Sequence, residues 1–304
     1  MRHVVILGAD GFIGRGLVRR LLEEGSENLT LLDRSFAEPA TDTRVRQVAG
    51  DLTDATYLAQ ALAQPVDLLF HLASLPGAAA ERQPHLGRAI NLDTPLALLA
   101  LLERQVTPAR VVLASSIAVY GALGGPVTED APCAPQISYG AHKWMTEIAL
   151  ADAARRGVID GRSLRLPGIV ARPAAETGHG SAFMSQIFHR IRAGQDYVLP
   201  VGLEAACWWM SRQTCIDNLL HAARFDDISA ARVWQLPVLH LTVAAVVAAM
   251  QDRYGRAAQI TAQPDPALQR LFGAMPALHT PRALAAGFRA DADVAALIRA
   301  AYAP

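Results

Sequence analysis

The sequence predicts an α/β fold, a doubly wound parallel sheet that carries a smaller, mostly helical C-terminal cap. Short apolar runs alternate with longer amphipathic segments through the first half of the 304 residues. Near-continuous apolar strands separated by helices are typical of a parallel sheet that helices cover on both faces. After Arg165 this alternation loosens, and the tail from about residue 239 has mostly helical periodicity.

Each apolar run is predicted to be a buried strand, and each amphipathic segment a helix on the sheet. The strands are residues 3–9, 29–33, 45–52, 66–74, 110–116 and 161–170, and the helices include residues 14–25, 91–105 and 144–157. We therefore predict a sheet domain of residues 1–165 plus about 206–238. The cap is predicted to comprise about 166–205 and 239–304.

The composition excludes several classes of protein. Lys plus Arg and Asp plus Glu both number 28, so no basic field favours nucleic acid. The three cysteines form no C-x-x-C pair and are interpreted as buried free thiols of a reducing compartment. The start has no signal segment, and no apolar run approaches the roughly 18 residues that a membrane span needs. These features predict a cytoplasmic protein with neither a membrane nor a nucleic-acid partner.

A glycine-rich turn follows the first predicted strand and opens a helix. Gly8, Gly11 and Gly14 have G-x-x-G-x-x-G spacing, with Phe12 and Ile13 between the last two. Glycines there allow a pyrophosphate to approach backbone N–H groups at the helix N-terminus. An acidic residue, Asp33, ends the next strand 19 residues after Gly14, where a carboxylate can accept both ribose hydroxyls of an adenosine. Together these features predict a dinucleotide site on a Rossmann-type sheet.

The acidic residue favours NAD over NADP, because Asp33 would repel a 2′-phosphate. Arg34 follows directly and either weakens that preference or is a solvated surface residue. Further strand ends should face the same cofactor, since ligands lie at the carboxyl ends of parallel strands. These ends supply Asp51, Leu52, Leu72, Ala73 and Ser74. His71, beside them, is interpreted as a structural polar group rather than a catalyst.

The stretch "SYGAHK", residues 138–143, holds a Tyr and a Lys four positions apart. Lys143 is the single lysine among 28 Lys and Arg residues. A phenol has a pKa near ~10 and is a poor base at neutral pH, but a cation close to it favours the ionised form. Lys143, one helical turn after Tyr139, can supply that charge and also reach the nicotinamide ribose. An Arg would not serve equally, because its planar fork is not a compact point charge. The alternative is an ordinary exposed Tyr–Lys pair.

The ordered motifs resemble the extended short-chain dehydrogenase/reductases, also called the NAD-dependent epimerase/dehydratase family. They comprise the glycine turn, Asp51-Leu52, His71-Leu72-Ala73, Asn91, "SSIAVYG" at 115–121 and Tyr139-x-x-x-Lys143. The resemblance implies a catalytic set of Ser116, Tyr139 and Lys143. It also implies that Asn91, Ser115 and Pro167 line the cofactor, the last through its backbone. A homodimer through the helices at about 91–105 and 141–156 is a further expectation from the family.

The expected chemistry is oxidation of a hydroxyl group. Tyr139 would take the hydroxyl proton while Ser116 hydrogen-bonds to the same oxygen, and hydride would pass to C4 of NAD. The sequence contains no H-E-x-x-H motif and no Cys/His cluster, so no metal is expected.

Three further features of the sequence bear on the substrate. "SSIAVYGAL" lacks the acidic pair of dehydratases, and Gly168 stands where many nucleotide-sugar epimerases have an Asn. "SSIAVYG", "CWWMSRQTCIDNLLHAA" and "GFRADADVAALIRAAY" resemble instead those members that oxidise the C2 hydroxyl of D-erythronate. Such a substrate would meet Ser74, Ser116 and Tyr139, and its carboxylate asks for a basic anchor, for which Arg172 and Arg212 are the candidates. A nucleotide-sugar 4-epimerase and a non-catalytic dinucleotide sensor stay as alternatives.

Overall fold

The structure is a computed structural model that describes the whole chain except residues 1, 26, 174–180, 227–231, 256 and 303–304. The chain divides into two compact units, each built from three separate stretches of sequence. The first unit comprises Met1–Ser116, Ser138–Arg165 and Leu219–Trp234, and the second comprises Ile117–Ile137, Leu166–Asn218 and Gln235–Pro304.

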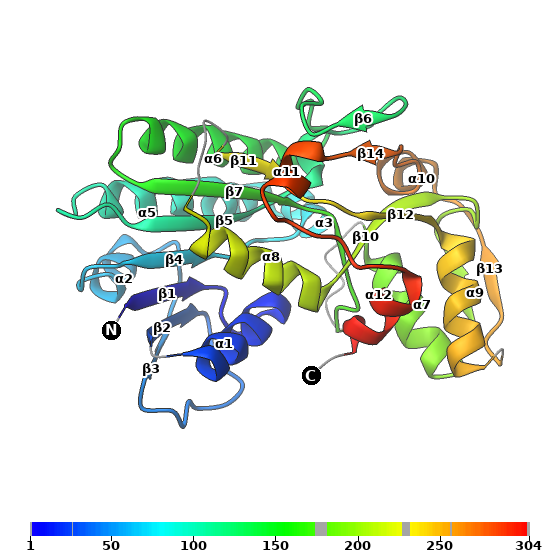
Figure 1. The fold of residues 1–304 in the computed structure, drawn as a ribbon, viewed down its shortest axis with the longest axis horizontal. Helices are drawn as coiled ribbons and strands as arrows, with labels where there is room; N and C mark the ends of the chain where they lie inside the picture. Colours follow the sequence, from blue (N-terminus) through cyan, green and yellow to red (C-terminus); the bar gives the residue numbers. More distant parts are fainter. Residues whose placement is uncertain (1, 26, 174–180, 227–231, 256, 303–304) are drawn as a thin grey trace. The chain divides into compact units, whose positions relative to one another are not determined.

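A seven-stranded sheet in the order β11-β7-β5-β4-β1-β2-β3 forms the centre of the first unit (Figure 1). The pairs β1–β2, β1–β4, β2–β3 and β4–β5 are all parallel. The chain moves outward from β1 to β3 and then crosses to β4, so the strand order reverses between β1 and β4. The loops after these two strands flank the crevice in which doubly wound sheets bind ligands. The strands are β1 (His3–Leu7), β2 (Asn28–Asp33), β3 (Val45–Ala49), β4 (Leu68–His71), β5 (Arg110–Ser116), β7 (Asp160–Leu166) and β11 (Val233–Gln235).

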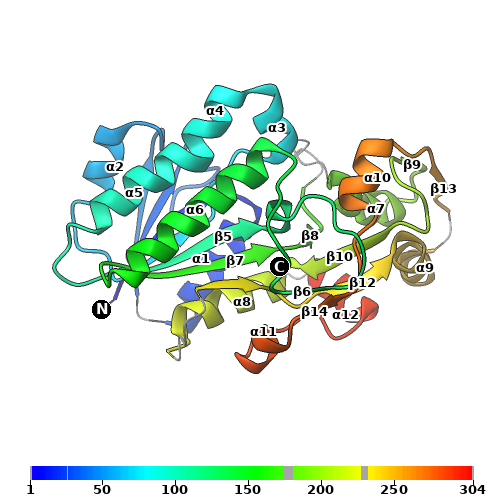
Figure 2. The same cartoon turned by 90° about the horizontal axis from the view of Figure 1, so that it is seen from above.

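Helices cover both faces of this sheet, because its strands are apolar on both sides. In Figure 2, α2, α5 and α6 lie across one face, and their residues Leu58, Leu98 and Leu150 share a buried core with Val5 and Leu7 of β1. In Figure 1, α1 lies on the other face. The helices are α1 (Phe12–Glu24), α2 (Ala55–Ala61), α3 (Gly77–Arg82), α4 (Pro84–Arg88), the π-helical turn η1 (Ala89–Asp93), α5 (Thr94–Leu102) and α6 (Ser138–Arg155); α8 (Arg212–Arg224) divides between the two units.

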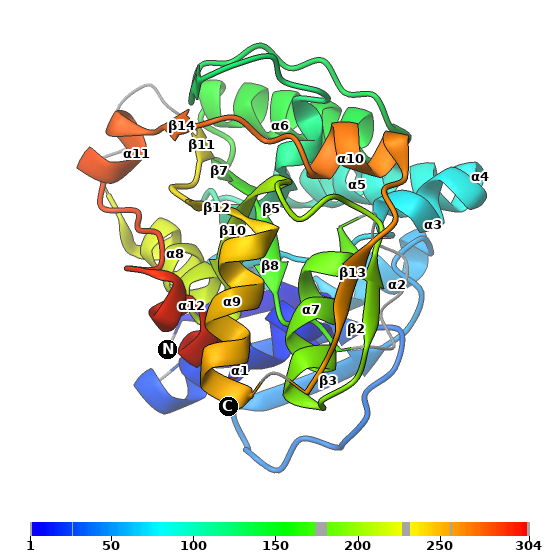
Figure 3. The same ribbon diagram turned by 90° about the vertical axis from the view of Figure 1, so that its right-hand side faces the viewer.

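The second unit combines short strands with helices around its own core. A three-stranded sheet has the order β12-β10-β8, and the pairs β13–β9 and β14–β6 are separate. Figure 3 shows α7 and α9 side by side, and the core between them includes Phe188, Trp209 and Val246. The elements are the 3-10 turn η2 (Ile117–Val119), β6 (Val127–Thr128), β8 (Gly168–Val170), α7 (Ala182–Arg192), β9 (Tyr197–Leu199), β10 (Ala206–Ser211), β12 (Leu239–Thr242), α9 (Val243–Tyr254), β13 (Ile260–Ala262), α10 (Pro266–Phe272), β14 (Leu278–His279), α11 (Pro281–Ala285) and α12 (Val294–Ala301).

The predicted doubly wound parallel sheet is confirmed, and three details differ from the sequence prediction. The predicted strand 161–170 is two strands, β7 and β8, because Pro167 between them has no N–H to donate to a sheet. The tail contains β12, β13 and β14 besides its helices. Residues 117–137 and 206–218 group with the second unit, since β6 pairs with β14 and β10 pairs with β8 and β12. Within the described residues, no helix is long and apolar enough to cross a membrane.

Candidate active site

The glycine turn lies between β1 and α1, at the point where the strand order reverses. Gly8 has φ +78°, and a Cβ there would lie 2.7 Å from the backbone nitrogen of Ala73. A Cβ on Gly14 would lie 2.1 Å from the carbonyl oxygen of Gly8. Both positions therefore require glycine, the first for its backbone conformation and the second for close packing of α1 on the turn.

The N-terminus of α1 fits the pyrophosphate of a dinucleotide. Gly11 is its N-cap, no side chain caps the helix, and its first turn has no acidic residue. The first backbone N–H groups of the helix, at Phe12 and Ile13, follow the glycine turn directly. Such groups, together with the helix dipole, bind anions.

Asp33 is held over this turn at the end of β2. Its carboxylate accepts hydrogen bonds from the backbone N–H groups of Asp10, at 2.9 Å, and Arg34, at 2.8 Å. Asp10 belongs to the glycine turn and pairs with Arg15 at 3.0 Å. The arrangement places a fixed carboxylate beside the turn, where an adenosine ribose would be recognised.

The ends of β3 and β4 supply the remaining predicted cofactor residues of the crevice. Asp51 accepts hydrogen bonds from the N–H and hydroxyl of Thr53, and these bonds hold the pKa of its carboxyl below the usual value. Leu52 is buried. Leu72, Ala73 and Ser74 form the loop after β4.

Asn91 fixes the loop after β4. Its side-chain oxygen accepts from the N–H of Leu75 at 2.8 Å, and its amide nitrogen donates to the carbonyl of Leu75 at 2.9 Å. Asn91 is 1 % exposed and lies in η1. It therefore acts on the predicted cofactor site through the loop, which passes against Gly8.

The predicted catalytic residues lie at the carboxyl end of β5 and in the first turns of α6. Ser116 is the last residue of β5, Tyr139 is the second residue of α6, and Lys143 is one turn further along that helix. The ammonium of Lys143 donates to the carbonyl of Ala114 at 2.8 Å and lies 5.7 Å from the centre of the Tyr139 ring. The backbone of β5 thus holds a buried ammonium beside the phenol ring.

His71 lies in the buried interior near Lys143. Burial and the charge of Lys143 lower the pKa of its imidazole to about 3, so the ring is neutral. Among the described residues, neither ring nitrogen has a hydrogen-bond partner. A neutral buried ring is in keeping with a structural role.

A buried ion pair near these residues, between Glu147 and Arg165, was not predicted from the sequence. The hydroxyl of Ser115 donates to the carboxylate of Glu147, and the Arg165 guanidinium pairs with the same carboxylate at 2.8 Å. All three are buried. The available signal was an acidic residue in an otherwise apolar part of α6 and a basic residue inside a buried strand. Ser115, predicted beside the cofactor, thus directs its hydroxyl to a side chain of α6.

Three predicted residues belong to the second unit. Pro167 lies between β7 and β8, Arg172 follows β8, and Arg212 begins α8. The backbone N–H of Arg172 donates to the hydroxyl of Ser185 at 3.0 Å. Arg172 also lines a small pocket with Ile169.

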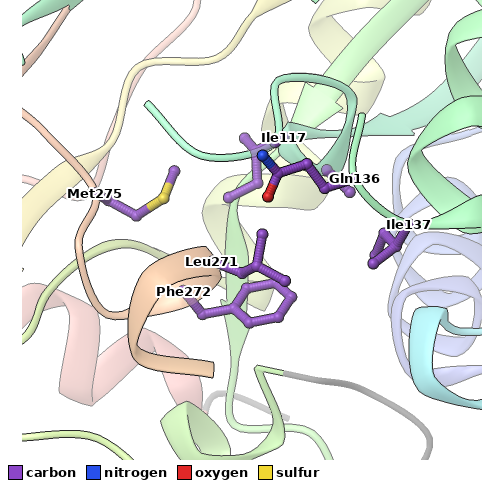
Figure 4. Close-up of a pocket in the computed structure, with 8 residues that line it drawn as sticks. Ile117, Gln136, Ile137, Leu271, Phe272 and Met275 are labelled. Atoms are coloured by element: carbon purple, nitrogen blue, oxygen red, sulfur yellow. The ribbon is translucent and has the colours of Figure 1, made fainter. Parts of the chain in front are cut away.

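Residues next in sequence to the predicted catalytic residues line a mostly apolar pocket of the second unit. Figure 4 shows Leu271 and Phe272, at the end of α10, pointing toward Ile117 and Gln136. Ile117 follows Ser116 directly, and Ile137, which also lines the pocket, precedes Ser138 at the start of α6. Gln136 is the one polar side chain in the lining, which also contains Ala118, Gly121 and Met275.

The arrangement in the first unit suits dinucleotide-dependent proton and hydride transfer. It combines a glycine turn at a helix N-terminus, a fixed carboxylate beside that turn, and a Tyr beside a buried ammonium. In the part of the chain that the structure describes, no group of three His, Cys, Asp or Glu side chains could hold a metal ion.

Sequence comparison relates nearly the whole chain to known proteins. The model of the NAD dependent epimerase/dehydratase family matches residues 4–229. D-erythronate dehydrogenase of Cupriavidus necator is 36% identical over 98% of this chain and 97% of the relative. D-erythronate dehydrogenase of Haemophilus influenzae is 30% identical over 95% of each chain. UDP-glucose 4-epimerase of Azospirillum brasilense is 29% identical over 85% of this chain and 74% of the relative.

Solved structures share the fold over the same length. The nucleoside-diphosphate-sugar epimerase from Agrobacterium tumefaciens superposes with a TM-score of 0.90 at 30% identity, over 98% of this chain and 92% of that one. The L-threonine dehydrogenase from Cupriavidus necator has a TM-score of 0.84 at 21% identity over 99% of both chains. The second likeness shows the fold alone.

Proposed function

The chain belongs to the NAD dependent epimerase/dehydratase family, and on that premise we propose that it oxidises the C2 hydroxyl of D-erythronate to the 2-oxo acid. It is an NAD-dependent dehydrogenase, related over nearly its full length to two D-erythronate dehydrogenases. One combined observation supports the proposal: the chain is similar to two D-erythronate dehydrogenases and also has Tyr139 beside the buried ammonium of Lys143.

The proposed mechanism assigns one task to each side chain. Tyr139, as the phenolate, takes the proton of the C2 hydroxyl, and Ser116 donates a hydrogen bond to the same oxygen. Lys143 stabilises the phenolate and also binds the nicotinamide ribose. Bound NAD supplies the hydride acceptor. Asp33 and the turn at Gly8–Gly14 hold the adenosine ribose and the pyrophosphate.

Assay of NADH formation tests this proposal. Purified protein with NAD and a panel of four- to six-carbon aldonates should produce NADH, with the highest kcat/KM for D-erythronate. The Tyr139→Phe variant should still bind NAD but should form NADH at least about 100-fold more slowly, because it lacks the base. If no aldonate is oxidised, or if Tyr139→Phe keeps its activity, the proposal is wrong.

A nucleotide-sugar 4-epimerase is the second candidate function. It is supported by the similarity to UDP-glucose 4-epimerase of Azospirillum brasilense and to the epimerase structure from Agrobacterium tumefaciens. An epimerase regenerates NAD in each turnover and would release no net NADH. Conversion of UDP-glucose without NADH release would therefore replace the dehydrogenase proposal with this one.

Arg172 and Arg212 are the proposed anchors of the substrate carboxylate, because an Arg can bind a carboxylate with two hydrogen bonds. Substitution of each by Met should raise the KM for D-erythronate about tenfold and leave the NAD affinity as it was. An unchanged KM in both variants would remove these residues from the proposal.

The proposal also includes a homodimer in the cytoplasm. Exposed apolar side chains on α5 and α6 support the dimer: Leu96, Met145 and Ile148 are 40%, 42% and 55% exposed. All three cysteines are free thiols, which supports a reducing compartment.

A further inference from the structure

The buried carboxylate of Glu147 occupies a defined place relative to the catalytic Lys143. Both residues lie on α6, four positions apart and on one face of the helix, and both are 2 % exposed. They bind adjacent residues of β5, because Lys143 donates to the carbonyl of Ala114 and Glu147 accepts from the hydroxyl of Ser115. Two successive turns of α6 are thereby attached to the end of β5, next to Ser116.

Arg165 provides the opposite charge for this carboxylate. Its Nη2 lies 2.8 Å from Oε2 of Glu147, and its Nε lies 3.1 Å and 3.2 Å from the two carboxylate oxygens. This is a two-point guanidinium–carboxylate pair, the strongest form of such a contact. It is buried, so salt and solvent screen it little.

The charges of this cluster leave one net positive charge. The carboxylate of Glu147 and the guanidinium of Arg165 cancel, and His71 is neutral. Within this cluster, the net positive charge is therefore that of Lys143, beside the ring of Tyr139. Without the guanidinium, the carboxylate four residues away would compensate Lys143 instead.

We propose that Glu147 and Arg165 are positioning residues for catalysis: the carboxylate fixes α6 to β5, and Arg165 neutralises it so that the charge of Lys143 acts on Tyr139. This inference rests on the proposed role of Tyr139 as the base. The carboxylate of Glu147 attaches α6 strongly to Ser115. Because Arg165 cancels its charge, this carboxylate does not compensate the ammonium of Lys143, which can then act on the phenol.

Variants of Glu147 and Arg165 should shift the pH profile of kcat/KM in opposite directions. Arg165→Met leaves a negative charge next to Lys143, so formation of the phenolate should require higher pH. The acid-side midpoint of the kcat/KM profile for aldonate oxidation should then rise by about one pH unit. Glu147→Gln removes the negative charge and leaves Arg165, so the midpoint should fall by about as much. The double variant Glu147→Gln/Arg165→Met restores the net charge and should return the midpoint to that of the wild type.

Other titratable groups around α6 are the same in every variant and contribute equally to each profile. They stand on the helices packed against α6, on α6 itself, on β5 and on β4: Glu81, Arg82, His85, Arg88, Asp93, Arg110, His142, Asp152, Arg155 and His71. A matched control is the pair of Arg156 and Glu103, whose side chains meet at 2.6 Å but are 41% and 29% exposed. This pair is 13 residues beyond Lys143, roughly 20 Å along the helix. Glu103→Gln and Arg156→Met should leave the midpoint where it is.

The readout separates this inference from a purely structural role. If the pair only braces the structure, both single variants should lose stability and kcat without opposite shifts of the acid-side midpoint. That result overturns the inference. A double variant whose midpoint stays shifted overturns it as well. Thermal unfolding and NAD binding show which variants fold. If Glu147→Gln does not fold, Arg165→Met and the double variant decide between the two outcomes. Absence of NADH formation by the wild type would instead contradict the proposed function.

Discussion

Lys143 has a buried side chain that contacts both β5 and Tyr139. Its ammonium is buried, donates to the carbonyl of Ala114 at 2.8 Å and lies 5.7 Å from the centre of the Tyr139 ring. An arginine keeps the charge but places a larger, planar group where the side chain is 2 % exposed. We expect Lys143→Arg to lower kcat about 100-fold or more, measured by steady-state NADH formation with D-erythronate.

The control for Lys143→Arg is a substitution that also preserves the charge but lies at an exposed ion pair. Arg156→Lys, at an exposed ion pair with Glu103, should keep the activity of the wild type. Near-normal turnover of Lys143→Arg would show that any cation suffices and would contradict the argument for an ammonium.

His71 gives a prediction about stability at low pH. Burial, and then the charge of Lys143, lower the pKa of its imidazole to about 3, whereas an unfolded histidine titrates near 6.5. Below about pH 6.5 the unfolded chain therefore binds a proton that the folded chain does not. The stability from this residue is complete above that pH and is lost as the pH falls toward 3, by about 2 kcal/mol at pH 5.

Urea unfolding at pH 7 and pH 5 measures this effect. His71→Gln removes the titrating ring, so its loss of stability between the two pH values should be about 2 kcal/mol smaller than that of the wild type. His85→Gln changes an exposed histidine and should lose as much as the wild type. Equal losses in all three proteins would mean that His71 is protonated in the folded state.

At the scale of elements, two amides hold β4 at its ends. Asn91 binds the N–H and carbonyl of Leu75 after the strand, and Gln105 binds the N–H and carbonyl of Val66 before it. Only the first amide holds the loop that passes against Gly8. Asn91→Leu removes two hydrogen bonds from that loop and should weaken NAD binding about tenfold, besides a stability loss of about 1–3 kcal/mol.

Gln105→Leu is the matched comparison, because it removes the same kind of contact at the far end of the strand. It should lower stability by a similar amount and leave the dissociation constant for NAD unchanged. Fluorescence titration with NAD gives the dissociation constant of each variant. Equal weakening of NAD binding in the two variants would show a general loosening of the sheet rather than an effect of the loop.

The elements that the sequence predicted are those with a strong period or length. β1, β2, β4 and β5 are apolar runs, and α1, α5 and α6 have helical patterns, so their existence follows from local sequence. β6 and β14 have two residues each, and such short strands carry no periodic signal. Their existence depends on partners that lie far away in the chain.

In the candidate site, too, only features that are local in the sequence could be predicted. The glycine turn and Tyr139-x-x-x-Lys143 are local patterns and could be located before the structure was known. The pair of Glu147 and Arg165 could not, because its members lie 18 residues apart on a helix and a strand. A buried charged residue signals that it has a partner, but only the packing of α6 against the sheet identifies which one.

At the scale of the whole molecule, the apolar face of α5 and α6 has a consequence for assembly. Leu96, Met145 and Ile148 remain exposed on these helices, and in the proposed dimer they would lie in the interface. A second copy of the chain can cover this face with the same face of its own, as two-fold symmetric dimers do.

Substitution of Ile148 by Glu tests the dimer. A carboxylate buried in an apolar interface without a partner costs several kcal/mol, so the wild type should elute as a dimer and Ile148→Glu as a monomer, measured by size-exclusion chromatography with light scattering. Val198 on β9 has the same 55% exposure, and Val198→Glu should remain dimeric because it lies outside this face. A dimeric Ile148→Glu variant, or a monomeric wild type at micromolar concentration, would place the contact elsewhere or remove it.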